Sequence, residues 1–171
     1  MSGRRPTGCA FDSSMDRTGL DLPIPGAGPL RLRHLLLDFN GTVAFDGQLI
    51  DGVASRLQAL APTLDIEILT GDTYGTVARA LAGVPVRHHV IATGQDKTAR
   101  AEALRAAGVA AVGNGRNDVE MLRTATLAVA VLGPEGAHAQ ALAAAHLVVP
   151  SILSALDLFL QPRRLVAGLR P

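Results

Sequence analysis

The sequence has few aromatic residues, a single cysteine and no tryptophan, and these scarcities limit what the chain can be. Aromatic residues make up 3% of the 171 positions, whereas hydrophobic residues make up 48% and charged residues 18%. The composition is that of one globular domain, and its core must be aliphatic, built from alanine, leucine and valine. Because Cys9 is the only cysteine, an intrachain disulfide is excluded.

Two further absences concern location and partners. No apolar run approaches the roughly 20 residues that a membrane-spanning helix needs, and residues 1–10 lack the apolar stretch of a secretory signal. The formal net charge of +1 gives no electrostatic case for binding nucleic acid. We therefore expect a cytoplasmic protein with no nucleic-acid or membrane partner. Met15 is an alternative start to Met1.

Composition divides the chain into three parts. Residues 1–29 are rich in glycine and proline, which predicts a flexible N-terminal arm without regular structure. Residues 30–161 alternate strand and helix signals and form the expected core domain. Residues 162–171 are expected to form a solvated basic tail.

The core region predicts an α/β fold. Short apolar runs that end at turn residues indicate strands, and apolar residues that recur on one face indicate helices. Alternation of the two predicts a three-layer α/β/α sandwich with a doubly wound, Rossmann-like parallel sheet and no cap domain. Asp46-Gly47 predicts a small hairpin. The expected strands are 33–38, 64–69, 86–91, 109–112, 127–132 and 147–149; the expected helices are 51–60, 73–81, 95–107, 119–124, 135–145 and 151–160, the last capped by Ser151.

Polar residues follow the ends of the expected strands. In a parallel sheet the carboxyl ends of the strands meet at one edge, which is where open α/β proteins bind ligands. We therefore expect these side chains to converge. They are Asp38 and Asn40 after the first strand, Thr70, Gly71 and Asp72 after the second, Lys97 at the start of a helix, and Asn114, Asn117 and Asp118 after the fourth.

These residue types suit phosphoryl transfer, which depends mainly on positioning and neutralisation of charge. Asp38 can be both nucleophile and Mg²⁺ ligand, and Asp118 and the amide oxygen of Asn114 can hold the same hard cation. The Thr70 hydroxyl, the Gly71 amide and the Lys97 ammonium can take phosphoryl oxygens. Each residue taken singly has an ordinary alternative as a cap, a turn residue or a solvated side chain.

Four segments in order carry a resemblance to a known family. They resemble the motifs of the haloacid dehalogenase-like (HAD) superfamily and are most similar to the phosphorylation domain of P-type ATPases. The likeness spans about residues 33–160. The segments are Asp38-Phe39-Asn40-Gly41-Thr42, Leu69-Thr70-Gly71-Asp72, Asp96-Lys97 and Gly113-Asn114-Gly115-Arg116-Asn117-Asp118.

The resemblance implies a soluble, capless, P-type ATPase-like phosphatase. Such an enzyme is a Mg²⁺-dependent phosphohydrolase or phosphotransferase of the EC 3.1.3 or 3.6 type that forms an aspartyl-phosphate on Asp38. Its substrate would be a phosphorylated small molecule or macromolecule, and its open site is compatible with a homo-oligomer. The backbone carbonyl of Asn40 would bind Mg²⁺, and Asp72 and Asn117 would support the inner residues. ATP is not expected as a specific substrate, because no nucleotide-binding domain separates the first two motifs.

Two asparagines depart from the family pattern. Phosphatases of the superfamily carry aspartate at position 40, where it protonates the leaving group and then activates water; Asn40 cannot exchange that proton. Asn114 likewise stands where the family has a metal-binding aspartate. The departures leave two alternatives open: a phosphorylatable or phosphate-binding regulatory module with little turnover, and an interaction protein on the same scaffold. The five histidines are expected to have structural or exposed roles.

Overall fold

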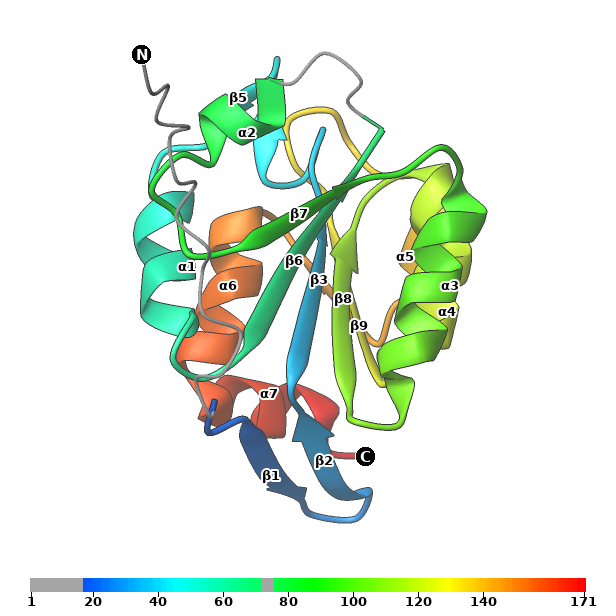
Figure 1. Cartoon of the computed structure of the whole chain (residues 1–171). Helices are drawn as coiled ribbons and strands as arrows, with labels where there is room; N and C mark the ends of the chain where they lie inside the picture. Colours follow the sequence, from blue (N-terminus) through cyan, green and yellow to red (C-terminus); the bar gives the residue numbers. More distant parts are fainter. Residues whose placement is uncertain (1–16, 72–75) are drawn as a thin grey trace, which may run out of the picture.

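A six-stranded parallel sheet forms the centre of the molecule (Figure 1). The computed structural model describes residues 17–71 and 76–171. Its central strands are buried on both faces, as continuous apolar runs predict. The strands are β3 (His34–Asp38), β6 (Asp65–Thr70), β7 (Arg87–Val90), β8 (Val109–Gly113), β9 (Leu127–Val131) and β10 (Leu147–Val149), and they lie in the order β10-β9-β8-β3-β6-β7.

Helices cover both faces of this sheet (Figure 1). Because side chains alternate along a strand, Leu35 and Leu37 pack with α1 and α6, whereas Leu36 packs with α3 and α4 on the other face. The expected three-layer sandwich is therefore confirmed, and the described residues include no cap domain. The helices are α1 (Val53–Leu60), α2 (Thr76–Ala80), α3 (Gly94–Arg105), α4 (Val119–Thr124), α5 (Ala139–Ala144), α6 (Ile152–Leu160) and α7 (Pro162–Leu169), with a 3₁₀ turn η1 (Arg116–Asp118).

Local sequence signals account for several element ends. Ser151 caps α6 as predicted, since its Oγ accepts a hydrogen bond from the Ser154 amide at 3.2 Å. The predicted hairpin is also present, with β4 (Ala44–Phe45) paired to β5 (Gln48–Leu49). Asp46 and Gly47 both have positive φ, as the turn of such a hairpin requires. No helix in the described part of the chain combines the length and apolar character that a membrane crossing requires.

The expectation that residues 1–29 lack regular structure is wrong for residues 20–29. Here β1 (Leu20–Ile24) and β2 (Gly28–Leu32) form an antiparallel hairpin. Gly26 and Gly28 adopt positive φ in its turn, so the glycines taken as signs of flexibility build the reversal. Residues 1–16, which include Cys9 and both candidate start residues, lie outside the described part of the chain. The division into domains stays a prediction.

The C-terminal segment is also more ordered than predicted. Residues expected to be a solvated tail form α7, which begins at Pro162, a favoured first helical residue. Leu165 is fully buried, and α7 lies against β1 at the end of the sheet opposite Asp38 (Figure 1). The apolar residues of this basic segment lie on one face of α7, and that face packs against the rest of the molecule. The helix expected over 135–145 is shorter than predicted, because residues 133–138 form a turn before α5.

Candidate active site

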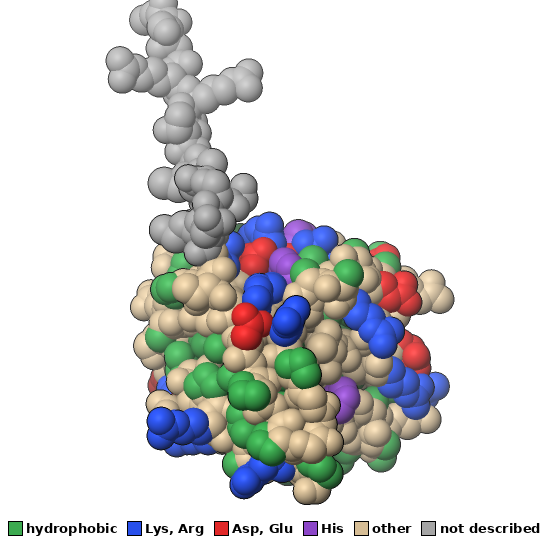
Figure 2. Space-filling view, turned by 90° about the horizontal axis from the view of Figure 1, so that it is seen from below, with side chains coloured by type: hydrophobic (Ala, Val, Ile, Leu, Met, Phe, Trp, Pro, Cys, Tyr) green, Lys and Arg blue, Asp and Glu red, His purple; other side chains and the backbone are tan. Residues whose placement is uncertain are grey.

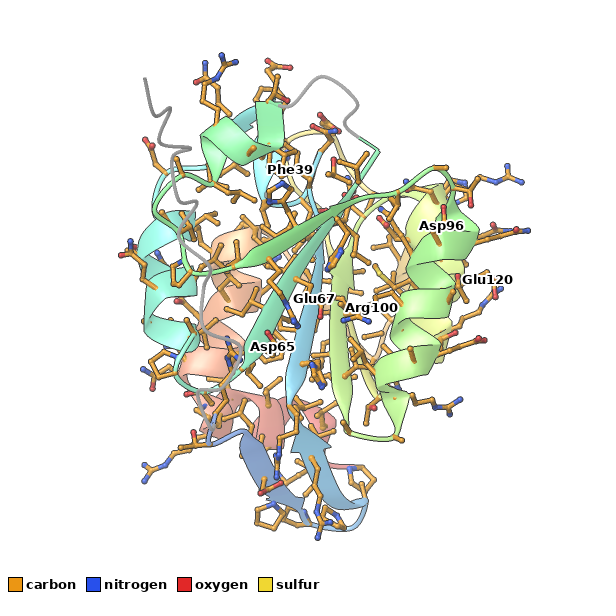
Figure 3. All side chains as sticks on the ribbon, viewed as in Figure 1. Phe39, Asp65, Glu67, Asp96, Arg100 and Glu120 are labelled. Carbon is orange, nitrogen blue, oxygen red and sulfur yellow. The ribbon has the colours of Figure 1, made fainter. Side chains whose placement is uncertain are left out.

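The register of the central strands places the predicted residues at one edge of the sheet. Asp38 pairs with Leu69, so Thr70 follows one position beyond it. On the other side Leu37 pairs with Val112, so Gly113 and the loop after it begin at the same level. Asp38 is buried, with 7% of its surface exposed, and Phe39 beside it is fully buried (Figure 3). The nucleophile candidate is therefore buried at the edge of the core.

Lys97 joins two carboxylates inside this site. Its Nζ lies 2.5 Å from Asp38 Oδ1 and 2.6 Å from Asp118 Oδ1, and the lysine is 1% exposed. Burial by itself lowers the pKa of Lys97, but the charges of Asp38 and Asp118 raise that pKa overall. Lys97, in the first turn of α3, therefore stays positively charged beside the two carboxylates at neutral pH.

The second oxygens of both carboxylates are also held. Thr42 Oγ1 donates to Asp38 Oδ2 at 3.0 Å. Asp118 Oδ2 accepts hydrogen bonds from the amides of Asn114 at 3.1 Å and Gly115 at 2.9 Å. A Cβ atom at position 113 would lie 2.7 Å from the carboxyl group of Asp118, so this close approach requires Gly113. Thr42 belongs to the first motif but was given no role from sequence.

The pKa of Asp38 is perturbed as expected for a functional carboxyl. Burial and the neighbouring charge of Asp118 raise it to about 6, while Lys97 and the Thr42 hydroxyl act in the opposite direction. The negative charge on Asp38 is therefore costly in the folded state. A carboxyl group with a raised pKa is common in reactive sites and also occurs in structural ion-pair networks.

The donor set fits a hard cation. Asn114 donates from Nδ2 to the carbonyl of Gly136 at 3.1 Å, which leaves its Oδ1 facing Thr42 Oγ1 at 3.3 Å. The Thr42 hydroxyl has one proton, so it can satisfy either Asn114 Oδ1 or Asp38 Oδ2 but not both. An oxygen acceptor is left over between two buried polar groups. Carboxylate and amide oxygens are ligands suited to Mg²⁺.

The remaining predicted residues lie at different depths. Thr70 is buried at the end of β6, and Gly71 after it is exposed. Asn40 is exposed. Asn117 is exposed and lines a cavity of about 600 Å³ beside the start of α3, away from the buried carboxylates. Asp72 lies outside the described residues.

A second group of acidic and basic side chains lies toward the other end of the sheet. His34, Asp65 and Glu67 come close enough to hold a metal ion, but they occupy the first half of β3 and β6, far along the strands from Asp38 (Figure 3). Figure 2 looks onto that end of the molecule and shows basic, acidic and histidine side chains interspersed on its surface. The cluster is therefore separate from the predicted site.

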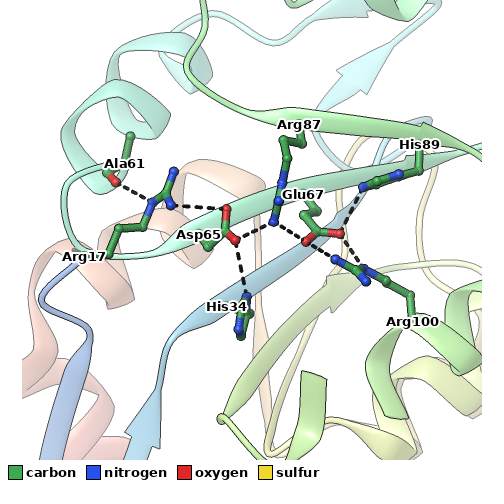
Figure 4. A network of polar contacts seen from close by, with 8 residues as sticks. All are labelled: Arg17, His34, Ala61, Asp65, Glu67, Arg87, His89 and Arg100. Carbon is green, nitrogen blue, oxygen red and sulfur yellow. Dashed lines mark hydrogen bonds and ion pairs between the residues drawn. The ribbon is translucent and has the colours of Figure 1, made fainter. Parts of the chain in front are cut away.

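Arginines already neutralise these carboxylates (Figure 4). Arg100 holds Glu67 through two hydrogen bonds of 2.6 and 2.7 Å, and Arg87 contacts both Glu67 and Asp65. Although burial of Glu67 acts to raise its pKa, the arginines lower it overall. A cation bound here would compete with these guanidinium groups, as a cation bound between Asp38 and Asp118 would compete with Lys97. His89, expected to be structural, also contacts Glu67.

The whole chain was compared with protein families and with individual proteins. No protein-family profile matches the chain. Two uncharacterised proteins of Methanocaldococcus jannaschii match it: one is 42% identical over 62 residues, 36% of this chain and 67% of that protein. The other is 49% identical over 39 residues, 23% of this chain and 89% of that protein.

Solved structures give wider coverage at lower identity. The cobalt-bound deoxy-D-mannose-octulosonate 8-phosphate phosphatase of Haemophilus influenzae has a TM-score of 0.63 at 15% identity, over 76% of this chain and 88% of that one. A Moraxella catarrhalis enzyme, in complex with magnesium, phosphate and its sugar acid, scores 0.62 at 19% identity, over 76% and 86%. A zinc-transporting PIB-type ATPase scores 0.59 at 23% identity, over 71% of this chain but 20% of the transporter.

Proposed function

Because this chain has the haloacid dehalogenase-like fold shared by capless phosphatases and P-type ATPase phosphorylation domains, we propose that it is a Mg²⁺-dependent phosphohydrolase. Asp38 would attack the phosphorus atom and form an aspartyl-phosphate. The observation that carries the proposal is the buried Lys97, which links Asp38 Oδ1 and Asp118 Oδ1 at the carboxyl edge of the sheet. A fold alone does not specify an activity, but this constellation suits one.

Each group has a role in the proposed reaction. The free electron pair of the Asp38 carboxylate attacks phosphorus, and the bond from phosphorus to the leaving oxygen breaks. Lys97 would neutralise the negative charge that otherwise opposes this attack, and the Thr70 hydroxyl and the Gly71 amide would donate to phosphoryl oxygens. Bound Mg²⁺, held by Asp38, Asp118, Asn114 and the Asn40 carbonyl, would supply further charge neutralisation.

The leaving group and the attacking water receive no acid–base help from Asn40. Asn40 is exposed, and its side-chain amide cannot gain or lose a proton near neutral pH. With a leaving group that needs little protonation, the aspartyl-phosphate is therefore expected to form faster than it hydrolyses. This residue also favours the second candidate function, a phosphorylatable regulatory module with little turnover.

The main test is a screen for release of inorganic phosphate with Mg²⁺. Aryl and acyl phosphates are the first substrates because their leaving groups need little protonation. Sugar phosphates come next, because the similar bacterial enzymes are phosphatases of a sugar-acid phosphate. The matched control is Asp38→Asn. Activity that survives this substitution undiminished would contradict the mechanism.

A second substitution separates the two candidate functions. Asn40→Asp adds an acid–base group, and we expect turnover to rise by about 10²-fold or more. Trapping of a phosphoenzyme in the wild type, with its loss in Asn40→Asp, would show that hydrolysis is the slow step. No increase in turnover would mean that the amide at position 40 does not limit the rate.

A further inference from the structure

Lys97 is the only lysine of the chain, and the helix that carries it has few apolar anchors. The fully buried residues of α3 are Lys97 itself and Ala101, while Leu104 is partly buried. An alanine holds a helix on a sheet less firmly than a large aliphatic side chain does, because it buries little apolar surface. The position of α3 on the sheet, and with it the position of the Lys97 ammonium, therefore also depends on polar contacts.

Glu67 provides such a contact from the strand beside Asp38. It pairs with Leu36 in the register of β3 and β6, and Leu36 packs with α3. Because side chains alternate along a strand, Asp38 and Glu67 project from the same face of the sheet. Glu67 is completely buried. Burial alone would raise its pKa, but the hydrogen bond and charge of Arg100 lower that pKa overall, so Glu67 is ionised.

Arg100 joins this carboxylate to α3. Its Nε donates to Glu67 Oε2 at 2.7 Å, and its Nη2 donates to Oε1 at 2.6 Å (Figure 4). A two-pronged contact between guanidinium and carboxylate fixes the orientation of both groups as well as their distance. Arg100 lies three residues after Lys97, so the two side chains are neighbours on one side of the helix. Two acidic residues of one sheet face thus receive two cations from one side of α3.

The two contacts hold α3 at two levels along the sheet. The helix runs against the direction of the strands, so Lys97 lies nearer the carboxyl edge than Arg100 does (Figure 1). Three residues of helix separate the two cations by about 4.5 Å along the axis. Leu36, the partner of Glu67, precedes Asp38 by two residues, or about 6.6 Å of strand. Long side chains bridge this small difference, so one placement of α3 satisfies both contacts.

We propose that Arg100 is a positioning residue, which through the buried Glu67 holds α3 where Lys97 reaches both Asp38 and Asp118. As a contribution to catalysis this inference rests on the proposed phosphohydrolase function, in which Lys97 neutralises charge. Arg100 acts through Lys97 and not on the substrate. Glu67 and Arg100 both lie outside the four motifs, and sequence analysis gave neither of them a role.

Amine labelling of Lys97 tests this inference without any measurement of activity. Because the chain has no other lysine, an acylating reagent modifies only Lys97 and the N-terminal amino group, which mass spectrometry of peptides separates. Lys97 is 1% exposed, so it reacts only when α3 moves away from the carboxylates. Arg100→Gln should raise the rate of Lys97 labelling by about tenfold or more, because a charged, two-pronged contact is lost.

Arg87→Gln is the matched control. It removes another arginine from the same Glu67 carboxylate, at 2.7 Å, but Arg87 belongs to the edge strand β7 and not to α3. Labelling of Lys97 in this variant should stay close to the wild-type rate. Urea unfolding of each variant separates a local movement of α3 from a general loss of stability. Equal labelling rates in Arg87→Gln and Arg100→Gln, fast or slow, would overturn the proposal.

Two further comparisons test the route through Glu67 and the link to catalysis. Glu67→Gln should raise labelling as Arg100→Gln does, and the double variant should label no faster than either; additive effects would contradict the route. Arg100→Gln should also lower kcat for phosphate release more than it changes KM, since Lys97 is misplaced. Faster labelling with unchanged kcat would overturn the contribution to catalysis. Absence of phosphate release from the wild type would overturn the proposed function, whereas labelling would still decide whether Arg100 positions Lys97.

Discussion

Asp38→Asn should make the folded protein more stable at neutral pH while it removes the proposed nucleophile. The folded-state pKa of about 6 lies above the ordinary value of 3.8. Between these values the folded state holds a proton that the unfolded state has lost, so the stability that Asp38 contributes falls as the pH rises. Asparagine keeps the shape of the neutral carboxyl group and does not ionise.

The magnitude follows from the size of the pKa shift. A shift of about 2 units at 1.36 kcal/mol per unit corresponds to about 3 kcal/mol. The two proteins should therefore have nearly equal free energies of unfolding near pH 4. Asp38→Asn should be more stable by about 3 kcal/mol above pH 7. Between these limits the difference should rise steadily with pH.

Urea unfolding at a series of pH values, with divalent cations chelated, measures this difference. Asp157→Asn is the control with the opposite sign: a hydrogen bond from Arg56 lowers the pKa of Asp157, so that variant should lose stability above about pH 4. A difference between Asp38→Asn and wild type that does not vary with pH would refute the reasoning. Lower stability of Asp38→Asn at pH 8 would refute it too.

Two further substitutions test the packing around and below the site. Lys97→Met leaves Asp38 and Asp118 buried without their cation and should cost about 3–5 kcal/mol of stability at pH 8. The loss should be smaller at pH 5, where one carboxyl is protonated. An equal loss of stability at both pH values would contradict the bridging role of Lys97. Leu165→Ala should cost about 2–5 kcal/mol in urea unfolding, because the leucine is fully buried on α7. A loss below about 1 kcal/mol would mean that α7 is not part of the cooperative fold.

Much of the sheet could be predicted because its signals are local. Apolar runs such as the one that ends at Asp38 mark buried strands, and the glycines and polar residues after them mark turns. The predicted convergence of Asp38, Lys97 and Asp118 also follows from one rule, that parallel strands end at a common edge. Their contacts in the structure agree with that prediction; the catalytic roles stay proposals.

The segments that were predicted wrongly depend on strand pairing, turn geometry and tertiary contacts that composition does not reveal. Residues 20–29 form strands because β1 pairs with β2 and packs on α7, and neither contact leaves a strong local pattern. The glycine and proline content of residues 1–29 is compatible with a flexible arm and also with a tight hairpin, so composition could not distinguish the two. Glu135 was misplaced because two hydrogen bonds hold its turn outside the helix: Asn114 Nδ2 donates to the Gly136 carbonyl, and the His138 amide donates to the Asn114 carbonyl.

The sequence by itself determined the kind of fold, the order of the main strands and helices between residues 33 and 160, and the set of polar residues at one edge of the sheet. These features depend on local burial patterns and turn chemistry, which neighbouring residues encode. Only the tertiary structure decided that Lys97 lies between Asp38 and Asp118, and that Arg100 of α3 reaches Glu67 of β6. Such distances are set by strand order, register and the packing of loops, which bring together residues far apart in the chain.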